Sequence, residues 1–251
     1  MPVRLVPPRR DRAGVSRLIR SVPCSMRCTG RPRPIPDVGS TRCDKVRRRD
    51  VLRCAWAAVR ANNGAPGIDK ITLAAVGEYD IDRLLGELAA ELEEGRYRPL
   101  PARRVYIPKP GVRDEQRPLS VPTVRDRIVQ AAVKIVLEAG FGAGMLDCSF
   151  GFRPRRCPHD ALQVLIDECW RGRRWVVETD VANCFSAIPH DKLMQAVQER
   201  ICDQPVLKLL RAMLRAGVME DGQLRRPVTG TPQGGVITPP TQWVTSALMS
   251  R

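Results

Sequence analysis

Six stretches with apolar residues at helical spacing, separated by two hairpin signals, most limit the folds open to this chain. The stretches cover residues 52–59, 81–92, 128–136, 162–169, 193–201 and 207–213. The hairpin signals are the KPG turn at 109–111, between two alternating segments, and Asp221-Gly222. Helices that alternate with a few short strands predict an α+β (mixed α/β) fold, with a small sheet backed by helices.

Capping residues and prolines indicate where several helices begin. Asp50 is the expected N-cap of the first helix, and Thr123 with Asp126 has the spacing of a capping box. Pro158 and Pro189 each precede a helical stretch, as prolines in a first turn do. The apolar run at 175–177 is the expected strand that leads into an acidic residue.

The length of 251 residues and the 43% hydrophobic content predict at least one folded domain. Residues 1–41 are rich in Arg, Pro, Ser and Cys and have scarcely any periodic apolar positions. Such a segment buries too little apolar surface to offset its ordering entropy. We therefore expect residues 1–44 to be disordered or extraneous.

A net charge of +15, dominated by arginine, predicts a polyanionic partner. Nucleic acid is the leading candidate, but an anionic membrane surface and a GC-rich genome that inflates arginine codons are both open on charge alone. No run of about 18 apolar residues occurs, and the basic N-terminus lacks a following apolar stretch. We expect no membrane association and a cytoplasmic location.

The nine cysteines are mostly isolated, so free thiols are the natural interpretation. Cys24 and Cys28 have a spacing that zinc ligands use, but no second pair follows, so we expect no zinc site. His159 and His190 stand at expected helix starts beside acidic neighbours. Capping or packing is the expected role of both.

Three features indicate chemistry, and each has a plainer alternative. Asp180 follows an expected strand, which suits a metal ligand, although such residues more often cap helices or form turns. The loop at 231–235 (TPQGG) would let its backbone approach a nucleotide or template, or it is a plain turn. Lys109 and Arg117 flank the hairpin turn and would bind a triphosphate, or they are ordinary surface charges.

Seven phrases in this order and at these intervals resemble group II intron reverse transcriptases, over about residues 45–238. They are NNGAPGID (62–69), VYIPKP (105–110), RPLSVP (117–122), RDRIVQ (125–130), SFGFRP (149–154), ETDVANCFSAIPHD (178–191) and TPQGG (231–235). The resemblance implies the right-hand fold of reverse transcriptases, as the fingers with an incomplete palm in residues 45–238. Residues 239–251 form a tail unlike the family.

The resemblance also implies roles for individual residues. Asp180 would be the first of three catalytic aspartates that bind two Mg²⁺ ions, with the backbone carbonyl of Val181 also facing metal. Phe185 would crowd the ribose 2′ hydroxyl of the incoming nucleotide. Lys109 and Arg117 would bind the triphosphate of a deoxynucleoside triphosphate.

The partners implied by the resemblance are intron RNA or an RNA template, together with a DNA primer. Gln233 would lie beside the incoming nucleotide. The phrase at 62–69 would grip template and intron RNA, through Asn63 and the backbone at Gly64 and Gly67. A loop that simply ends a helix is the alternative for this phrase.

The chain departs from the family after the TPQGG loop. The family supplies its remaining carboxylates from a Tyr-x-Asp-Asp turn, whereas this sequence has no Asp-Asp pair and no acidic residue after Asp221. Pro239 and Pro240 oppose the helix expected there, which suggests a frameshift or premature junction near Thr238. We expect a member of a lineage of RNA-directed DNA polymerases and maturases that does not polymerise by itself. The alternatives are a non-catalytic RNA-binding module and a decayed product that does not fold.

Overall fold

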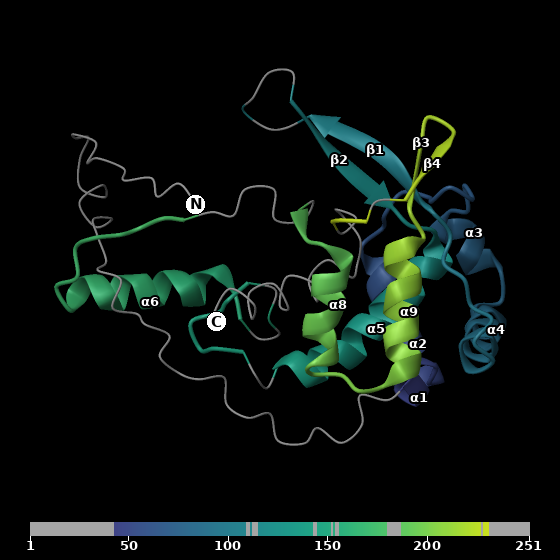
Figure 1. Ribbon diagram of the computed structural model, residues 1–251, viewed down its shortest axis with the longest axis horizontal. Helices are drawn as coiled ribbons and strands as arrows, with labels where there is room; N and C mark the ends of the chain where they lie inside the picture. The colour runs from purple at the N-terminus through teal and green to yellow at the C-terminus, as the bar shows by residue number, and fades with distance from the viewer. Residues whose placement is uncertain are drawn as a thin grey trace. The chain divides into compact units, whose positions relative to one another are not determined.

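The computed structural model describes residues 43–108, 111, 115–142, 145–151, 153, 156–179, 187–226 and 228–230 (Figure 1). The helices are α1 (Cys43–Val46), α2 (Arg49–Ala61), α3 (Leu73–Glu78), α4 (Ile81–Glu93), α5 (Val124–Gly142), α6 (Pro158–Trp170), α8 (His190–Gln198) and α9 (Gln204–Arg215). The strands are β1 (Ala102–Pro108), β2 (Gln116–Val121), β3 (Val218–Glu220) and β4 (Gln223–Arg225). Helix α6 belongs to one compact unit and the other elements to a second, larger unit.

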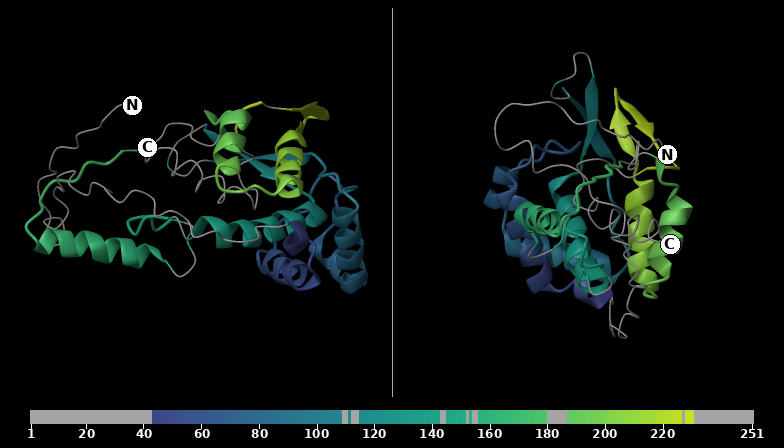
Figure 2. Two further views of the ribbon diagram at one scale, coloured as in Figure 1. Left: turned by 60° about the horizontal axis from the view of Figure 1, so that its bottom comes forward. Right: turned by 90° about the vertical axis from the view of Figure 1, so that its left-hand side faces the viewer.

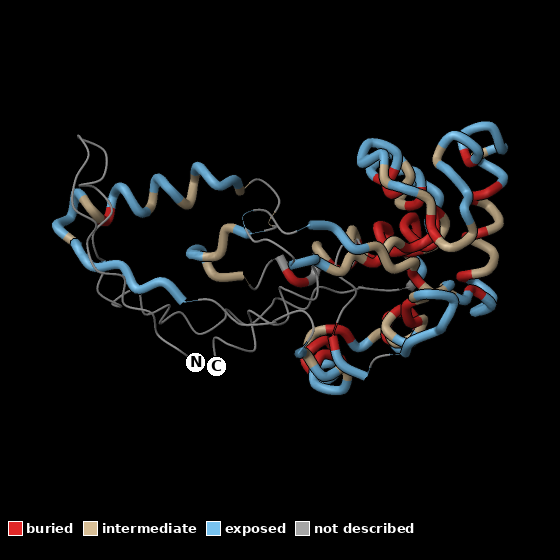
Figure 3. The backbone as a smooth tube through the Cα atoms, turned by 90° about the horizontal axis from the view of Figure 1, so that it is seen from above, coloured by how far each residue is buried: buried red, intermediate tan, exposed pale blue. Residues whose placement is uncertain are grey.

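The core of the larger unit forms around α5, which packs against α1 and α2. Helix α2 also packs on α4, and α8 packs on α9. The apolar stripes read from the sequence are the buried faces of these helices, as shown by Leu52 of α2, Leu88 of α4 and Ile128 of α5, all with no exposed surface. Figure 3 shows that the buried positions of this unit gather where its helices meet.

The sheet has the strand order β2-β1-β3-β4. Strand β1 pairs antiparallel with β2 and parallel with β3, while β3 and β4 form an antiparallel hairpin, so the two hairpins lie side by side (Figure 2). The turn between β3 and β4 has positive φ at both central residues, Asp221 (50°) and Gly222 (77°). This two-residue primed turn confirms the hairpin predicted from Asp221-Gly222.

The start of α5 confirms the predicted cap and adds a buried network to it. The Thr123 hydroxyl accepts a hydrogen bond from the Asp126 backbone N–H at 3.1 Å. The Asp126 carboxylate accepts from the Thr123 hydroxyl at 2.8 Å, the Tyr97 hydroxyl at 2.5 Å and the Leu100 backbone N–H at 3.1 Å. Burial raises the pKa of Asp126, and burial with the nearby carboxylate raises the pKa of Tyr97 well above its ordinary range.

The structure differs from the sequence prediction at the start of α2 and in the presence of α3. Asp50 is not the N-cap of α2: that position is Arg48, whose side chain makes no capping hydrogen bond and instead pairs with Asp50 in the first turn at 2.6 Å. The six-residue α3 was not predicted, since its short sequence shows no full apolar stripe. Its N-cap is Thr72, whose side chain accepts from the Ala75 backbone N–H at 3.1 Å.

The strand predicted at 175–177 is absent from the structure. These residues belong to no strand, and Trp175 is 73% exposed. Among the described residues of the unit that holds α6, no strand is available to pair with them. The helix expected after Pro158 is confirmed as α6, with proline in its first turn.

No helix in the described part of the chain is long and apolar enough to span a bilayer. Helix α1 starts at Cys43 and so includes the last two residues of the segment 1–44. The boundary expected near residue 238, the Cys24 and Cys28 pair and nearly all of the segment 1–44 lie outside the described residues.

Candidate active site and nucleic-acid interface

The end of the Asp180 phrase meets the segment that precedes the TPQGG loop in sequence. The Gly230 backbone N–H donates to the Ile188 carbonyl at 2.7 Å, and the His190 backbone N–H donates to the Val228 carbonyl at 3.2 Å. Segment 188–190, which ends the Asp180 phrase, is thereby joined to segment 228–230, which leads into the TPQGG loop. Sequence alone could not predict this junction, because about 40 residues separate its two sides.

His190 adds a side-chain bond to this junction. Its Nε2 lies 2.6 Å from the carbonyl oxygen of Gly230. A carbonyl oxygen only accepts, so Nε2 carries the proton in this contact. The histidine is the first residue of α8 and contacts Gly230, which agrees with the packing role expected for it.

Five of the predicted site residues lie outside the described residues, four of them in the two catalytic phrases. These four are Asp180, Val181, Phe185 and Gln233, and their roles stay predictions. Lys109 of the hairpin is also outside, while Arg117 is described. The described residues therefore include Arg117 and the junction at His190, but not the expected metal ligands.

Arg117 lies in the outer part of the β1–β2 hairpin, which extends beyond the helices of its unit (Figure 1). It faces Ile107 across the strand pair, and both side chains are exposed. Its guanidinium has no hydrogen bond or ion pair with any residue that the structure describes. An exposed arginine with no internal partner is free to bind an anion, so triphosphate binding stays a prediction that suits its position.

Two other arginines of the hairpin form hydrogen bonds within the protein. The Arg104 guanidinium donates to the Ser120 hydroxyl at 3.1 Å across the strands. The Arg103 guanidinium donates to the Pro66 carbonyl at 2.8 Å and so holds the loop at 62–69 against β1. The net positive charge of the chain thus overstates the number of cations that are free for a partner.

The loop at 62–69 is seated on the start of α5, and its glycines permit this. A Cβ on Gly67 would lie 2.6 Å from the Thr123 Cα atom, and a Cβ on Gly64 would lie 2.4 Å from the Arg127 guanidinium. That guanidinium donates to the Ala65 carbonyl at 2.8 Å, and burial lowers the pKa of Arg127. Both glycines therefore have an internal role. RNA contact through their backbone stays a prediction.

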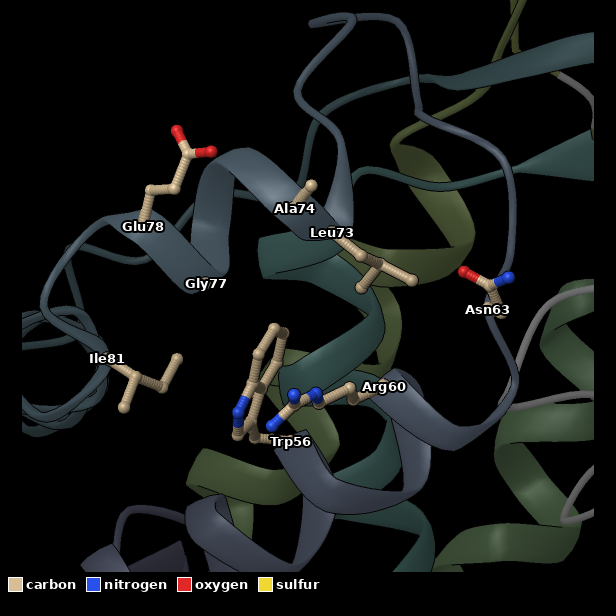
Figure 4. A pocket seen from close by; sticks show the side chains of 8 residues that line it. All are labelled: Trp56, Arg60, Asn63, Leu73, Ala74, Gly77, Glu78 and Ile81. Atoms are coloured by element: carbon tan, nitrogen blue, oxygen red, sulfur yellow. The ribbon is translucent and has the colours of Figure 1, made fainter.

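Sequence reasoning missed a pocket beside this loop (Figure 4). It has a volume of about 510 Å³ and is bordered by α2, α3, the start of α4 and Asn63. Trp56 was expected only as a residue of the apolar stripe, but it is half-buried and lines the pocket. A signal was available, since Trp56 and Arg60 are four apart and share one face of α2.

Comparison with known proteins identifies the family. Residues 107–243 match the family model described as "Reverse transcriptase (RNA-dependent DNA polymerase)". The chain belongs to the reverse transcriptase family. Segment 107–243 includes Arg117, the junction at His190 and the TPQGG loop, so the structural frame described above belongs to the matched region.

The relatives of this reverse transcriptase chain include a protein named as encoded by a group II intron. The chain is 39% identical over 180 residues to protein YkfC of Escherichia coli K12, covering 70% of this chain and 46% of YkfC. It is 36% identical over 194 residues to the group II intron-encoded protein LtrA of Lactococcus lactis subsp. cremoris, covering 76% of this chain and 31% of LtrA. The chain thus spans less than half the length of either relative.

Solved structures confirm the expected fold. A chain of the partial Cas6-RT-Cas1–Cas2 complex superposes with a TM-score of 0.54 and 19% identity, covering 82% of this reverse transcriptase chain and 34% of that chain. The mixture of helices with a small mixed sheet agrees with the α+β class and with a partial reverse transcriptase fold.

Reverse transcriptases use a divalent metal ion, and its expected ligands here, Asp180 and Val181, are outside the described residues. Within the part of the chain that the structure describes, no group of three or more His, Cys, Asp or Glu side chains is arranged to hold a metal ion. The described residues therefore do not form the metal centre of the reverse transcriptase by themselves.

Proposed function

We propose that this chain is the fingers and first part of the palm of an RNA-directed DNA polymerase of the group II intron type. The polymerase copies intron RNA into DNA and assists splicing as a maturase in the cytoplasm. The observation that carries the proposal is the junction between segments 188–190 and 228–230 inside the region that matches the family. The two segments are continuous in sequence with the Asp180 phrase and the TPQGG loop, which supports a shared site for both phrases.

The proposal assigns nucleotide chemistry to residues of the matched phrases. Asp180 and the Val181 carbonyl are the proposed Mg²⁺ ligands, and bound Mg²⁺ polarises phosphoryl oxygens. Phe185 is the proposed ribose gate, and Lys109 and Arg117 the proposed triphosphate ligands. The guanidinium of Arg117 is not paired with any described residue, and this supports its proposed role in binding the triphosphate.

The proposal assigns template binding to the other predicted residues. Gln233 is the proposed neighbour of the incoming nucleotide, and Asn63 with the loop at 62–69 is the proposed contact to template or intron RNA. Asn63 is exposed and has a positive φ of 42°, so its side chain is presented outward at the end of α2. The DNA primer is the remaining proposed partner.

Primer extension on an RNA template, with Mg²⁺ and deoxynucleoside triphosphates, tests the polymerase assignment. The assay uses a polypeptide of the relatives' length that contains this chain, since the chain spans 31% of LtrA and 46% of YkfC. We expect incorporation that Asp180→Asn abolishes. Asp191→Asn is the matched control, because Asp191 is an exposed carboxylate in the first turn of α8.

Two results would contradict the assignment. Incorporation that survives Asp180→Asn would show that Asp180 is not a metal ligand. Equal loss in Asp180→Asn and Asp191→Asn would show that the assay reports a general effect of charge removal.

For these 251 residues alone we propose RNA binding without polymerisation. The specific observation is that this sequence has no Asp-Asp pair and no acidic residue after Asp221. Two-metal chemistry requires more carboxylates than Asp180 supplies. Incorporation by the 251-residue chain that depends on Asp180 would overturn this second proposal.

A further inference from the structure

We propose that the pocket beside α2, α3 and the start of α4 binds one unpaired nucleobase of a single-stranded RNA. The proposal rests on the RNA-binding function proposed above and adds a site that sequence reasoning did not predict. The pocket has a volume of about 510 Å³, within the range of roughly 300–1,000 Å³ that small-molecule sites occupy.

The walls combine one aromatic face with aliphatic side chains. Trp56 and Arg60 extend side by side from α2, and Leu73 of α3 and Ile81 of α4 border the same space (Figure 4). Trp56, Leu73 and Ile81 are each half-buried, so each presents part of its apolar surface to the pocket. An indole beside aliphatic groups suits a flat apolar ligand face.

The polar groups of the pocket have no partners among the described residues. The Trp56 indole N–H, the Arg60 guanidinium and the Asn63 amide make no side-chain hydrogen bond or ion pair within that part of the chain. Neighbouring cations behave differently: Arg53 of α2 binds Asp82 at 2.7 Å, and Arg83 of α4 binds Glu87 at 3.1 Å. The unpaired donors and acceptors thus gather at the pocket.

A nucleobase fits this combination better than a phosphate does. The edges of a base offer both donors and acceptors, and its face stacks on an aromatic ring or a guanidinium plane. A phosphate site would concentrate positive charge, but here the lining contains Glu78 as well as Arg60. A base inside a duplex has its face covered by neighbouring bases, so the occupant is an unpaired base.

The proposed pocket adjoins the loop at 62–69, which contributes Asn63 to it. The loop is fixed to α5 by Arg127 and to β1 by Arg103, so the amide of Asn63 follows a backbone that is held at both sides. An RNA strand that follows this loop would therefore present its bases to the pocket.

Gly77 provides a way to close the pocket without disturbing the core. It lies on α3 at the edge of the pocket, and a Cβ added there meets no atom within 4 Å (Figure 4). Gly77 is exposed and helical, so a side chain at this position causes no backbone strain. Gly77→Leu would occupy pocket space, whereas Gly77→Ala would leave most of it open.

The test measures binding of the 251-residue chain to a fluorescently labelled single-stranded RNA of about 12 nucleotides, by anisotropy. We expect Trp56→Ala and Gly77→Leu each to weaken binding about tenfold, the effect typical of losing one stacked base. Trp56→Phe and Gly77→Ala are the matched controls, and we expect both to bind within about twofold of wild type. Two independent variants keep the test decisive if one of them folds poorly, which circular dichroism will show.

Two results of this binding assay would contradict the proposals in different ways. Unchanged affinity in both disruptive variants, with wild-type chain still binding RNA, would overturn the pocket and leave the proposed function intact. Absence of RNA binding by the wild-type chain would contradict the proposed function and the pocket with it.

A duplex RNA ligand and a free-nucleotide competitor show what kind of molecule occupies the pocket. We expect an RNA duplex of the same sequence to bind all variants equally, and a loss of duplex affinity in the disruptive variants would overturn the assignment to an unpaired base. We also expect millimolar adenosine monophosphate to leave the RNA bound. Displacement by this nucleotide would assign the pocket to free nucleotides and overturn the assignment to RNA.

Discussion

At the residue scale, the glycines of the 62–69 loop differ in what surrounds them. The position of a Cβ on Gly67 is blocked by the backbone of Thr123, at 2.6 Å from its Cα atom and 2.7 Å from its nitrogen. The position of a Cβ on Gly64 is blocked by the end of the Arg127 side chain, which can rotate away. The family phrase contains both glycines, but only Gly67 faces an obstacle that cannot move.

We predict that Gly67→Ala lowers the free energy of unfolding by about 1–3 kcal/mol, as overpacking against fixed atoms does. Gly64→Ala should cost less. Gly77→Ala, in open space on α3, should instead raise stability by about 0.5–1 kcal/mol through helix propensity. Urea denaturation followed by circular dichroism measures all three, and equal losses from Gly64→Ala and Gly67→Ala would contradict the prediction.

The buried carboxyl of Asp126 gives a pH prediction. Burial raises its pKa above the ordinary value of 3.8, against the lowering effect of hydrogen bonds from Tyr97 and Thr123. A carboxyl with a higher pKa in the folded state contributes stability below its ordinary pKa, and this contribution is lost as the pH rises through the raised pKa. The wild-type free energy of unfolding should therefore contain a component that falls as the pH rises above about 4.

Asp126→Asn removes that component, because an amide does not titrate. Urea denaturation at a series of pH values compares the variant with wild type, and Asp191→Asn serves as a control that removes an exposed carboxylate. We expect the control to keep the wild-type profile. Identical profiles in wild type and Asp126→Asn would show that Asp126 is not the titrating group.

At the scale of elements, the β3–β4 hairpin depends on its primed turn. Gly222 has a φ of 77°, so Gly222→Val should destabilise the hairpin by about 1–2 kcal/mol, the cost of a left-handed conformation for a residue with a side chain. Asp221→Asn should be tolerated, since asparagine accepts this conformation as readily. Urea denaturation of both variants is the measurement, and a larger loss from Asp221→Asn than from Gly222→Val would contradict the turn assignment.

Sequence predicts elements well where local pattern decides them. The stripe of α5 and the cap at Thr123 were predicted correctly, because helix burial and capping depend on neighbours three or four residues away. The strand at 175–177 was wrong because a strand needs a partner, which local sequence does not report. The parallel pairing of β1 with β3 was beyond prediction for the same reason.

The candidate site divides in a similar way. Motif order identified the family and Arg117, whose exposure and lack of a partner the structure then described. The pocket at Trp56 was missed because its walls come from three helices, whose approach depends on packing. The seating of Gly67 on Thr123 is likewise a contact between distant segments.

At the scale of the whole molecule, the charge of +15 predicts RNA affinity that falls steeply with salt. Each phosphate contact contributes about 0.7 to the slope of log affinity against log salt for a single strand. We predict that Arg117→Ala weakens binding to all RNA sequences alike and reduces this slope by roughly one contact. Affinity measured by anisotropy over a series of salt concentrations gives the slope.

Arg48→Ala is the matched control for that measurement. Arg48 carries the same charge as Arg117 but already pairs with Asp50 at 2.6 Å. Its removal should change the slope much less. A larger effect from Arg48→Ala than from Arg117→Ala would show that internal pairing does not decide which arginines meet RNA.

The parallel pairing of Ala102 with Val218 has a consequence for how the protein is made. At synthesis rates of about 5–20 residues per second, β1 leaves the ribosome roughly 6–20 s before β3 exists. During that interval the β1–β2 hairpin presents an open edge, and α6 and its neighbours are produced before the edge is closed. Completion of the sheet is therefore a late, non-local step in folding, and the nascent chain is most exposed to misassociation while it waits for its third strand.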